Sequence, residues 1–198
     1  MPFLEPTNPA ARAHEAGLTQ ERGLVVWLYG LSGAGKTTLA NEVARRVRAE
    51  GRPALVLDGD QLRHGLNRDL GFSDHDRTEN LRRAAEVARM LATNGFFVLG
   101  AFITPRQSHR ALIRRIVGAD LELAYLAASV EDCARRDPKG LYAQALRGEL
   151  PNFTGVGADF EPPGAAEAAL VLDTVGSPVS ASAETLLARI LPRLVPRP

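Results

Sequence analysis

Short apolar runs alternate along the chain with longer segments whose apolar residues recur at helical spacing. The short runs are bounded by glycine, proline or charged residues, which is typical of strands buried on both faces of a sheet. They predict five strands, at residues 23–29, 54–60, 96–102, 121–127 and 168–174. The longer segments predict helices at residues 36–50, 74–94, 130–137 and 180–194, and one that follows Thr104-Pro105 and runs to about Val117. This alternation predicts an α/β fold, a five-stranded parallel sheet with helices on both faces.

The sequence predicts one folded domain with two less regular regions. A chain of 198 residues is the usual size of a single α/β domain. Residues 1–22 are rich in proline and alanine and are expected to form a loosely held arm before a domain at residues 23–198. Residues 138–168 are rich in glycine and proline, and only 140–147 could form a short helix. A long irregular stretch inside a compact domain is typical of a lid.

Composition and charge exclude several classes of function. The 24 basic and 23 acidic residues nearly cancel, so neither nucleic acid nor a membrane is an expected partner. No apolar run approaches the roughly 18 residues of a membrane span, and the start of the chain lacks the pattern of a secretory signal. Cys133 is the single cysteine, which allows neither an internal disulfide nor a cysteine metal cluster. A cytoplasmic location is therefore expected.

The first predicted strand leads directly into a glycine-rich turn and a helix. The turn has the spacing G-x-x-x-x-G-K-T, which is typical of a loop that wraps nucleotide phosphates with its backbone N–H groups. The helix start adds a partial positive charge. In this motif Lys36 reaches the β- and γ-phosphates of ATP, and the Thr37 hydroxyl helps to hold Mg²⁺. The predicted ATP-binding residues are Gly30, Leu31, Ser32, Gly33, Ala34, Gly35, Lys36, Thr37 and Thr38.

A GTPase is excluded by the remaining motifs. Asp137 to Gly140 fit the pattern D-x-x-G but follow a predicted helix rather than a strand, and no N-K-x-D string is present. A pure ATPase needs an acidic residue after an apolar strand to hold the metal. The chain offers Asp58, Asp60 and the late Asp173 at such ends.

Two carboxylates, Asp58 and Asp60, follow the second predicted strand. Ligands of open parallel sheets bind outside the carboxyl ends of the strands, so both face the phosphate loop. Asp60 and Lys36 are the predicted catalytic residues, and a carboxylate at Asp60 can accept a hydroxyl proton or help to hold Mg²⁺ during phosphoryl transfer. The alternative is that one of the two simply caps the helix that follows.

Residues that suit an anionic, flat acceptor follow the two carboxylates. The polar residues are Arg63, His64, Asn67, Arg68, Arg77 and Asn80. Arginine makes forked hydrogen bonds to oxyanions, so this cluster predicts an anionic acceptor. Phe72 and Phe153 lie in polar, glycine-rich surroundings, where a ring suits stacking on a base, although core packing is an equal alternative for each.

Several segments together resemble one enzyme family. They are "GLSGAGKTTLA", "LDGDQLRHGLNRDLGFSDHDRTENLRR", "AFITP", "RDPKGLY" and "NFTG...FEPP". From about Gly23 to the end, the chain is similar to the adenylylsulfate kinases, which are P-loop kinases. The resemblance implies transfer of phosphate from MgATP to the 3′-hydroxyl of adenylylsulfate (APS), giving 3′-phosphoadenylylsulfate for sulfate assimilation. It also implies a homodimer and leaves open an association with an ATP sulfurylase.

The resemblance implies a role for individual residues. Asp60 would lie beside the 3′-hydroxyl and the metal, and Lys139 would belong to a lid that closes over both nucleotides. The residues implied to bind the acceptor are Asp60, Arg63, Phe72, Arg77, Asn80, Ile103, Lys139 and Phe153. Of these, the arginines and Asn80 would hold its sulfate and phosphate, the two rings would enclose its adenine, and the backbone of Ile103 would help to seat it.

Three positions depart from the family's pattern. Gln61 replaces an asparagine, and Phe160 replaces a tyrosine in the lid. Thr104 stands where the family has a serine that has been proposed as a transient phosphate carrier. Direct in-line transfer needs no enzyme hydroxyl, so Thr104 is expected to be a supporting residue rather than a phospho-acceptor.

Two other functions fit parts of the pattern. Another small-molecule kinase, acting on a nucleoside monophosphate or a sugar acid, would share the phosphate loop but would not need the "DGDQLRHGLNRDLGFS" block. A catalytically silent nucleotide-binding partner would have no physical need to keep Lys36, Thr37, Asp60 and Lys139 together.

Overall fold

The computed structural model describes residues 23–150, 152–164, 167 and 170–194. The predicted arm, residues 1–22, lies outside the described residues. Five parallel strands form one sheet, in the order β2-β3-β1-β4-β5. The strands are β1 (Leu24–Tyr29), β2 (Ala54–Asp58), β3 (Phe97–Phe102), β4 (Leu121–Ala127) and β5 (Leu170–Asp173). The predicted α/β class with five parallel strands is confirmed.

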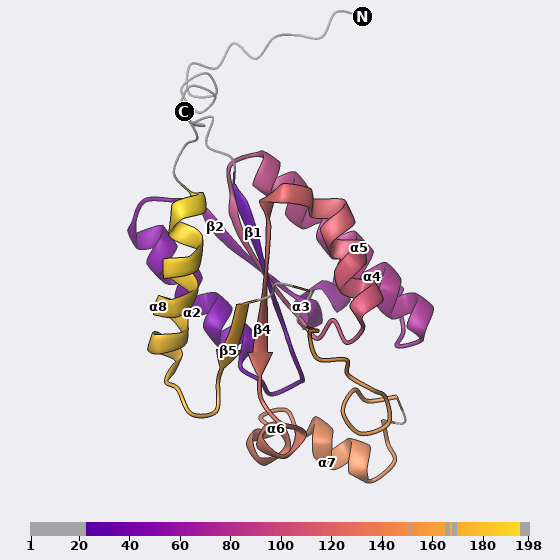
Figure 1. The fold of residues 1–198 in the computed structure, drawn as a ribbon. Helices are drawn as coiled ribbons and strands as arrows, with labels where there is room; N and C mark the ends of the chain where they lie inside the picture. The colour runs from indigo at the N-terminus through magenta and orange to yellow at the C-terminus, as the bar shows by residue number, and fades with distance from the viewer. Residues whose placement is uncertain (1–22, 151, 165–166, 168–169, 195–198) are drawn as a thin grey trace, which may run out of the picture.

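Helices cover both faces of this sheet (Figure 1). One face is covered by α2 (Lys36–Ala49) and α8 (Val179–Ile190), and the other by α4 (Asp74–Thr93) and α5 (Gln107–Val117). The shorter elements are α3 (Gly59–Arg63), α6 (Val130–Arg136), α7 (Leu141–Leu146) and the 3₁₀ turns η1 (Gly118–Asp120) and η3 (Leu191–Arg193).

Helices α2 and α8 bury the apolar stripes that their sequences predict. Leu39, Val43 and Val47 of α2 are buried against one face of the sheet, with Leu186 and Ile190 of α8 beside them. Apolar positions at this spacing fall on one side of a helix, so the stripe packs on the sheet while charged residues face water. The predicted helices at residues 36–50 and 74–94 therefore agree with α2 and α4 to within one residue.

Two predicted element ends are corrected by the structure. The second strand was expected to run to residue 60 but ends at Asp58, because Asp58 caps a short helix that begins at Gly59. The last helix was expected to run to residue 194, but α8 ends at Ile190 and a 3₁₀ turn follows. Pro192 has no N–H to continue an α-helix, which accounts for the change.

The central strand, β1, lies between β3 and β4 and is buried along its whole length. Trp27 of β1 stacks on Phe102 of β3, with ring centroids 4.4 Å apart. A Cβ atom at Gly100 would lie 2.8 Å from the Trp27 ring, so only glycine allows this packing. The chain places β2 and β3 on one side of β1 and β4 and β5 on the other. Such a switch in strand order is where open α/β sheets bind ligands.

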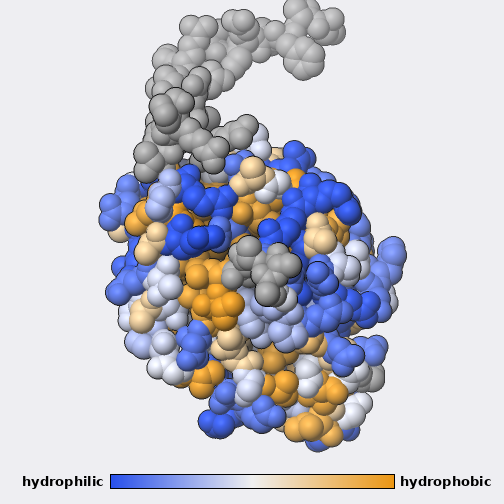
Figure 2. Space-filling model, viewed as in Figure 1, coloured by the Kyte–Doolittle hydropathy of each residue, from blue (hydrophilic) through white to orange (hydrophobic). Residues whose placement is uncertain are grey.

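The region predicted as a lid extends beyond the carboxyl ends of the strands. Figure 1 shows α6, α7 and the following loop below the layered part of the molecule. Figure 2 shows apolar residues gathered over this lower region, and Leu146 of α7 is 74% exposed. Among the residues that the structure describes, no helix is both long and apolar enough to cross a membrane.

Candidate active site at the carboxyl edge of the sheet

The glycine-rich turn between β1 and α2 has the backbone that a phosphate-binding loop requires. Gly30, Gly33 and Gly35 have φ angles of 150°, 80° and 91°, which side chains other than glycine rarely adopt. At Gly33, a Cβ atom would also lie 3.1 Å from the Cys133 carbonyl oxygen. The turn is supported from the lid side, where the Tyr142 hydroxyl donates to the Ser32 carbonyl at 3.0 Å. The glycines therefore set the backbone shape of the loop, and the Tyr142 hydrogen bond supports it from the lid side.

Lys36, in the first turn of α2, folds back over this loop. Its Nζ donates to the carbonyls of Gly30 at 3.0 Å and Leu31 at 2.6 Å. Burial lowers the pKa of Lys36 to about 8, although the nearby carboxylates of Asp58 and Asp60 oppose the shift. An ammonium group held at the mouth of the loop is suited to bind phosphate oxygens.

Thr37 and Asp58 form a pair at the base of the loop. The Thr37 hydroxyl donates to Asp58 Oδ2 at 2.6 Å. The other oxygen of Asp58 caps α3, accepting from the N–H groups of Asp60 at 2.9 Å and Gln61 at 3.3 Å. The capping alternative is therefore observed for Asp58, which also links α3 to the phosphate loop.

The same pair fits a magnesium ion that arrives with a nucleotide. Mg²⁺ prefers hard oxygen ligands and is usually held by one or two protein groups, by waters and by substrate phosphates. Thr37 Oγ1 and Asp58 Oδ2 are two such oxygens on adjacent side chains. In the described part of the chain, no group of three or more histidine, cysteine or acidic residues could hold a metal without a substrate. The residues present thus fit a metal bound jointly with phosphate.

Asp60 lies in the first turn of α3, beyond the capping carboxylate. Because Asp58 takes the capping bonds, the Asp60 carboxylate remains available and forms an ion pair with Lys139 from the lid region. Both side chains are largely exposed to solvent. The structure thus brings Lys36, Thr37, Asp60 and Lys139 to one edge of the sheet.

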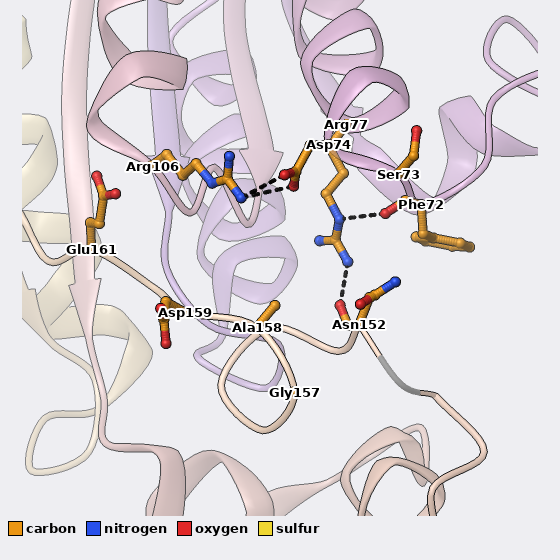
Figure 3. A pocket seen from close by; sticks show the side chains of 10 residues that line it. All are labelled: Phe72, Ser73, Asp74, Arg77, Arg106, Asn152, Gly157, Ala158, Asp159 and Glu161. Carbon is orange, nitrogen blue, oxygen red and sulfur yellow. Dashed lines mark hydrogen bonds and ion pairs between the residues drawn. The ribbon is translucent and has the colours of Figure 1, made fainter.

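A cavity of about 520 Å³ lies beside this edge (Figure 3). One wall is the start of α4, and the opposite wall is the loop after α7. The lining residues are Phe72, Ser73, Asp74, Arg77, Arg106, Asn152, Gly157, Ala158, Asp159 and Glu161. The cavity is polar, with Arg106 paired to Asp74 and with the carboxylates of Asp159 and Glu161 in the lining. Arg77 is the lining arginine best suited to meet an anionic group of a ligand.

Two predicted arginines surround the Phe72 ring. The Arg63 guanidinium lies 4.4 Å from the ring centroid, and that of Arg77 lies 5.9 Å from it. Arg77 also donates to the Phe72 carbonyl at 3.0 Å and, across the cavity, to the Asn152 carbonyl at 2.5 Å (Figure 3). Phe72 is 63% exposed, so much of its side chain is accessible to a flat ligand.

Comparison with known proteins identifies the family. A family model described as adenylylsulphate kinase matches residues 22–172. The chain belongs to the adenylylsulfate kinase family. It is 48% identical over 174 residues to the adenylyl-sulfate kinase of Paraburkholderia xenovorans, with 88% of this chain and 96% of that protein covered. The resemblance stated from the sequence is therefore confirmed.

Solved structures of adenylylsulfate kinases share the fold. The Mycobacterium tuberculosis APS kinase CysC, in complex with AMPPNP and APS, is 43% identical with a TM-score of 0.82; 86% of this chain and 98% of that chain are covered. A hexameric APS kinase from Thiobacillus denitrificans is 27% identical with a TM-score of 0.65, covering 98% of this chain and 35% of that chain. The predicted P-loop kinase fold is confirmed.

Of the eight residues that the family resemblance assigns to the acceptor, two line the cavity, Phe72 and Arg77, and six do not: Asp60, Arg63, Asn80, Ile103, Lys139 and Phe153. Phe153 packs edge-on against Tyr142, with ring centroids 4.9 Å apart, and contacts the core. Asn80 is buried and accepts a hydrogen bond from Asn67 Nδ2 at 2.8 Å. The Ile103 carbonyl accepts from the Gly30 N–H of the phosphate loop at 3.2 Å. In this structure the two rings predicted to enclose the adenine thus lie in different surroundings.

Thr104 is a buried residue with an unusual backbone. Its φ angle is 48°, and its hydroxyl oxygen accepts from the buried Trp27 Nε1 at 2.9 Å. A non-glycine residue with positive φ is strained and persists only where neighbours hold it. Here the Trp27 bond holds it at the end of β3, directly after the Ile103 carbonyl that supports the phosphate loop.

The structure adds site residues that sequence reasoning missed. Asp74 is one of them, because both its carboxylate oxygens accept from Arg106 Nη2 at 2.8 Å on the cavity wall. Glu161 lines the same cavity from the lid side. No local motif marks these positions, because they come together only when α4, α5 and the lid loop pack.

Proposed function

We propose that this chain transfers the γ-phosphoryl group of ATP to the 3′-hydroxyl of adenylylsulfate, giving 3′-phosphoadenylylsulfate and ADP in sulfate assimilation. The observation that carries this function is the Asp60 carboxylate. It pairs with Lys139 and lies near enough to Lys36 to affect the pKa of that lysine. This position supports a role for the Asp60 carboxylate where an acceptor hydroxyl would meet a γ-phosphate.

The proposed chemistry is a direct, in-line transfer. The 3′-oxygen attacks the γ-phosphorus, the bond between that phosphorus and the β–γ bridging oxygen breaks, and ADP leaves. Asp60 takes the proton that the hydroxyl loses. Lys36 binds the β- and γ-phosphates, and Lys139 moves from Asp60 to the transferring group when the lid closes. Charge that spreads over the phosphoryl oxygens is thereby met by two ammonium groups.

We propose that Thr37 and Asp60 help to hold Mg²⁺, with Asp58 orienting Thr37. The 2.6 Å bond between the Thr37 hydroxyl and Asp58 supports the orienting role of Asp58, whose carboxylate is itself a further candidate ligand. Asp60 is proposed as a ligand from its exposed carboxylate at the same edge of the sheet. When bound, the ion would neutralise phosphate charge and so assist transfer. ATP-binding residues Gly30, Leu31, Ser32, Gly33, Ala34, Gly35 and Thr38 supply the backbone and helix start around the phosphates.

The acceptor is proposed to bind in the cavity between α4 and the lid loop. Arg63 and Arg77 hold its anionic groups, and Phe72 offers one face to its adenine. Lid closure is proposed to bring Phe153 toward the other face of the adenine. Asn80 and Ile103 are proposed to support the acceptor site without contacting the cavity directly. Thr104 is proposed to carry no phosphate, because its hydroxyl is buried and bonded to Trp27.

The remaining proposals concern setting and assembly. The single cysteine, Cys133, supports a cytoplasmic location. A homodimer is proposed, and the hexameric relative supports self-association of this fold. Association with an ATP sulfurylase is a further proposal, tested by co-elution of the two proteins in gel filtration.

One assay tests the function. Purified protein is given MgATP with adenylylsulfate, AMP, CMP or gluconate, and ADP release is followed. Turnover with adenylylsulfate alone is the expected result. Turnover with another acceptor would instead indicate a different small-molecule kinase, and no turnover with any acceptor would indicate a silent nucleotide-binding module.

A further inference from the structure

A charged residue occupies the buried face of α5. The buried positions of this helix are His109, Arg110, Ile113 and Val117. Arg110 is 1% exposed, and its guanidinium lies 5.2 Å from the centroid of the Tyr29 ring in the central strand. Arginine is rarely so buried, because removing its charge from water is costly unless partners compensate.

The partners of Arg110 come from the far end of the lid region. Its Nε and Nη2 donate to the two carboxylate oxygens of Glu167, at 2.7 Å and 2.9 Å, as a bidentate pair. Its Nη1 donates to the Glu161 carbonyl at 2.9 Å and approaches the Thr104 carbonyl at 3.5 Å. Arg110 therefore connects α5, the end of β3 and the return of the lid loop.

Further bonds attach the same loop segment to the start of α5. The Glu161 carboxylate accepts from the Gln107 N–H at 2.7 Å, and the Glu161 N–H donates to the Pro105 carbonyl at 2.8 Å. Glu167 also accepts from the Gly164 N–H at 3.0 Å. The Arg110 guanidinium holds the pKa of Glu167 below its usual range, so the pair is charged at neutral pH.

This cluster lies behind one wall of the acceptor cavity. Gly157, Ala158, Asp159 and Glu161 form that wall, opposite the start of α4 (Figure 3). One end of the wall is held by Arg77, which bonds to the Asn152 carbonyl and the Thr154 hydroxyl. The other end is held by the Arg110 cluster. The width of the cavity thus depends on both attachments.

Stability alone does not account for such a pair. Replacing a buried ion pair with apolar residues of similar volume is often neutral or stabilising. A forked guanidinium, in contrast, fixes the relative position of the groups that it joins. Arg110 joins two parts of the wall segment to the core, which an apolar side chain could not do.

We propose that Arg110 and Glu167 are positioning residues for the acceptor. The pair fixes the lid-side wall of the cavity at the spacing that adenylylsulfate requires, while the phosphate loop has its own bonds to the Tyr142 hydroxyl and the Ile103 carbonyl. This inference rests on the proposed function for the identity of the acceptor. It assigns to these two residues no contact with the reacting atoms.

A double replacement separates positioning from stability. In the Arg110→Met/Glu167→Met variant both charges are removed, so the fold is kept without an unpaired buried charge. The expected result is an acceptor KM raised by about tenfold or more, because small displacements of positioning groups cost rate steeply. The ATP KM is expected to stay within about twofold of the wild-type value, since its loop is supported elsewhere. Glu167→Gln, which keeps shape and removes only charge, should shift the acceptor KM in the same direction.

Glu122 supplies a matched control at the opposite edge of the sheet. This buried carboxylate accepts from Arg189 at 3.2 Å and from Arg193 at 2.6 Å at the start of β4. Glu122→Gln should lower the melting temperature and leave both KM values unchanged. If the double variant has the wild-type acceptor KM, or if both KM values rise together, the positioning role is wrong.

A measurement made without substrate tests the positioning role independently of whether the proposed function is correct. Amide exchange followed by NMR should be about tenfold faster or more at Gln107 and Glu161 in the double variant, because the bonds that protect them are loosened. Exchange at these two amides in Glu122→Gln should match the wild type. Unchanged exchange in the double variant would overturn the proposal even if the wild-type protein proved inactive on adenylylsulfate.

Discussion

The phosphate loop and the acceptor cavity lie side by side but are built in different ways. The loop is one contiguous stretch, and its lysine bonds to a carbonyl six residues away. The cavity joins segments that are far apart, since the bond between Arg77 and Asn152 spans 75 positions. The loop binds with backbone N–H groups, which local glycines can orient. The cavity binds with side chains, whose positions depend on packing across the whole fold.

The two regions also differ in exposure. Lys36 is half-buried and has a lowered pKa, whereas Phe72 is 63% exposed. A preformed donor site beside an open acceptor site fits a kinase whose lid must close over the acceptor. Substitutions between the two regions, in the acceptor cavity and at the phosphate loop should therefore have different effects on turnover, acceptor binding and ATP binding.

The largest effect is expected at the junction of the two regions. Asp60→Asn should lower kcat by about 100-fold or more, because a general base typically contributes that much. The ATP KM should change little, since the phosphate loop is intact. Steady-state kinetics with both substrates test this. Asp69→Asn is the matched control, because Asp69 is also an exposed aspartate paired with a basic residue, Arg83. If Asp60→Asn keeps more than a tenth of the wild-type turnover, Asp60 has no catalytic role.

A change on the acceptor side should leave the donor side untouched. Phe72→Ala is expected to weaken acceptor binding by about 1–3 kcal/mol, the usual worth of stacking on a base. Calorimetry with adenylylsulfate and, separately, with an ATP analogue measures both affinities. Met90→Ala, at an exposed apolar residue of α4, serves as the control. Equal losses for the two ligands would contradict the separation of the two regions.

A change on the donor side should weaken ATP binding and leave acceptor binding unchanged, and the expected effect is smaller than that of Phe72→Ala. Tyr142→Phe removes the 3.0 Å bond to the Ser32 carbonyl behind the phosphate loop. The expected loss is about 1 kcal/mol of stability or of ATP affinity, the typical net worth of one hydrogen bond. Chemical denaturation and ATP-analogue titration measure these quantities. A higher acceptor KM with unchanged ATP affinity would show that Tyr142 belongs to the other region.

The smallest effect concerns acid sensitivity behind the acceptor cavity. His109 lies 3.2 Å from the Thr78 hydroxyl, and burial, aided by Arg106, lowers its pKa below the usual 6.5. Between these two pKa values the unfolded chain binds more protons, so stability falls as pH drops below about 6.5. His109→Gln should remove that part of the acid loss while leaving stability at pH 8 similar. Parallel denaturation curves at pH 8 and pH 5.5 decide this; identical pH dependence in both proteins would rule it out.

Sequence patterns were sufficient where a function depends on neighbouring residues. The apolar runs predicted all five strands, and G-x-x-x-x-G-K-T predicted the phosphate loop, because strand burial and loop shape follow local composition. The roles of Asp58 and Asp60 were left open between capping and chemistry. Only the structure assigned the cap to Asp58, since that choice depends on where β2 ends.

Long-range contacts were not predictable in the same way. Asp74, Arg106 and Glu161 meet at one cavity without any motif in common. Arg110 looks like one more basic residue on an amphipathic helix, yet its partner is 57 positions away. A single sequence records no distance between such residues, so it cannot distinguish a buried arginine from a solvated one.

The sequence by itself determined the fold class, the phosphate loop and the family, because periodicity and contiguous motifs specify local geometry. The tertiary structure alone decided which side chains face the acceptor, which aspartate caps, and what holds the lid's return segment. Those outcomes depend on which surfaces pack together. Packing brings together residues that are far apart in the sequence, and the sequence distance between them does not show that they are in contact.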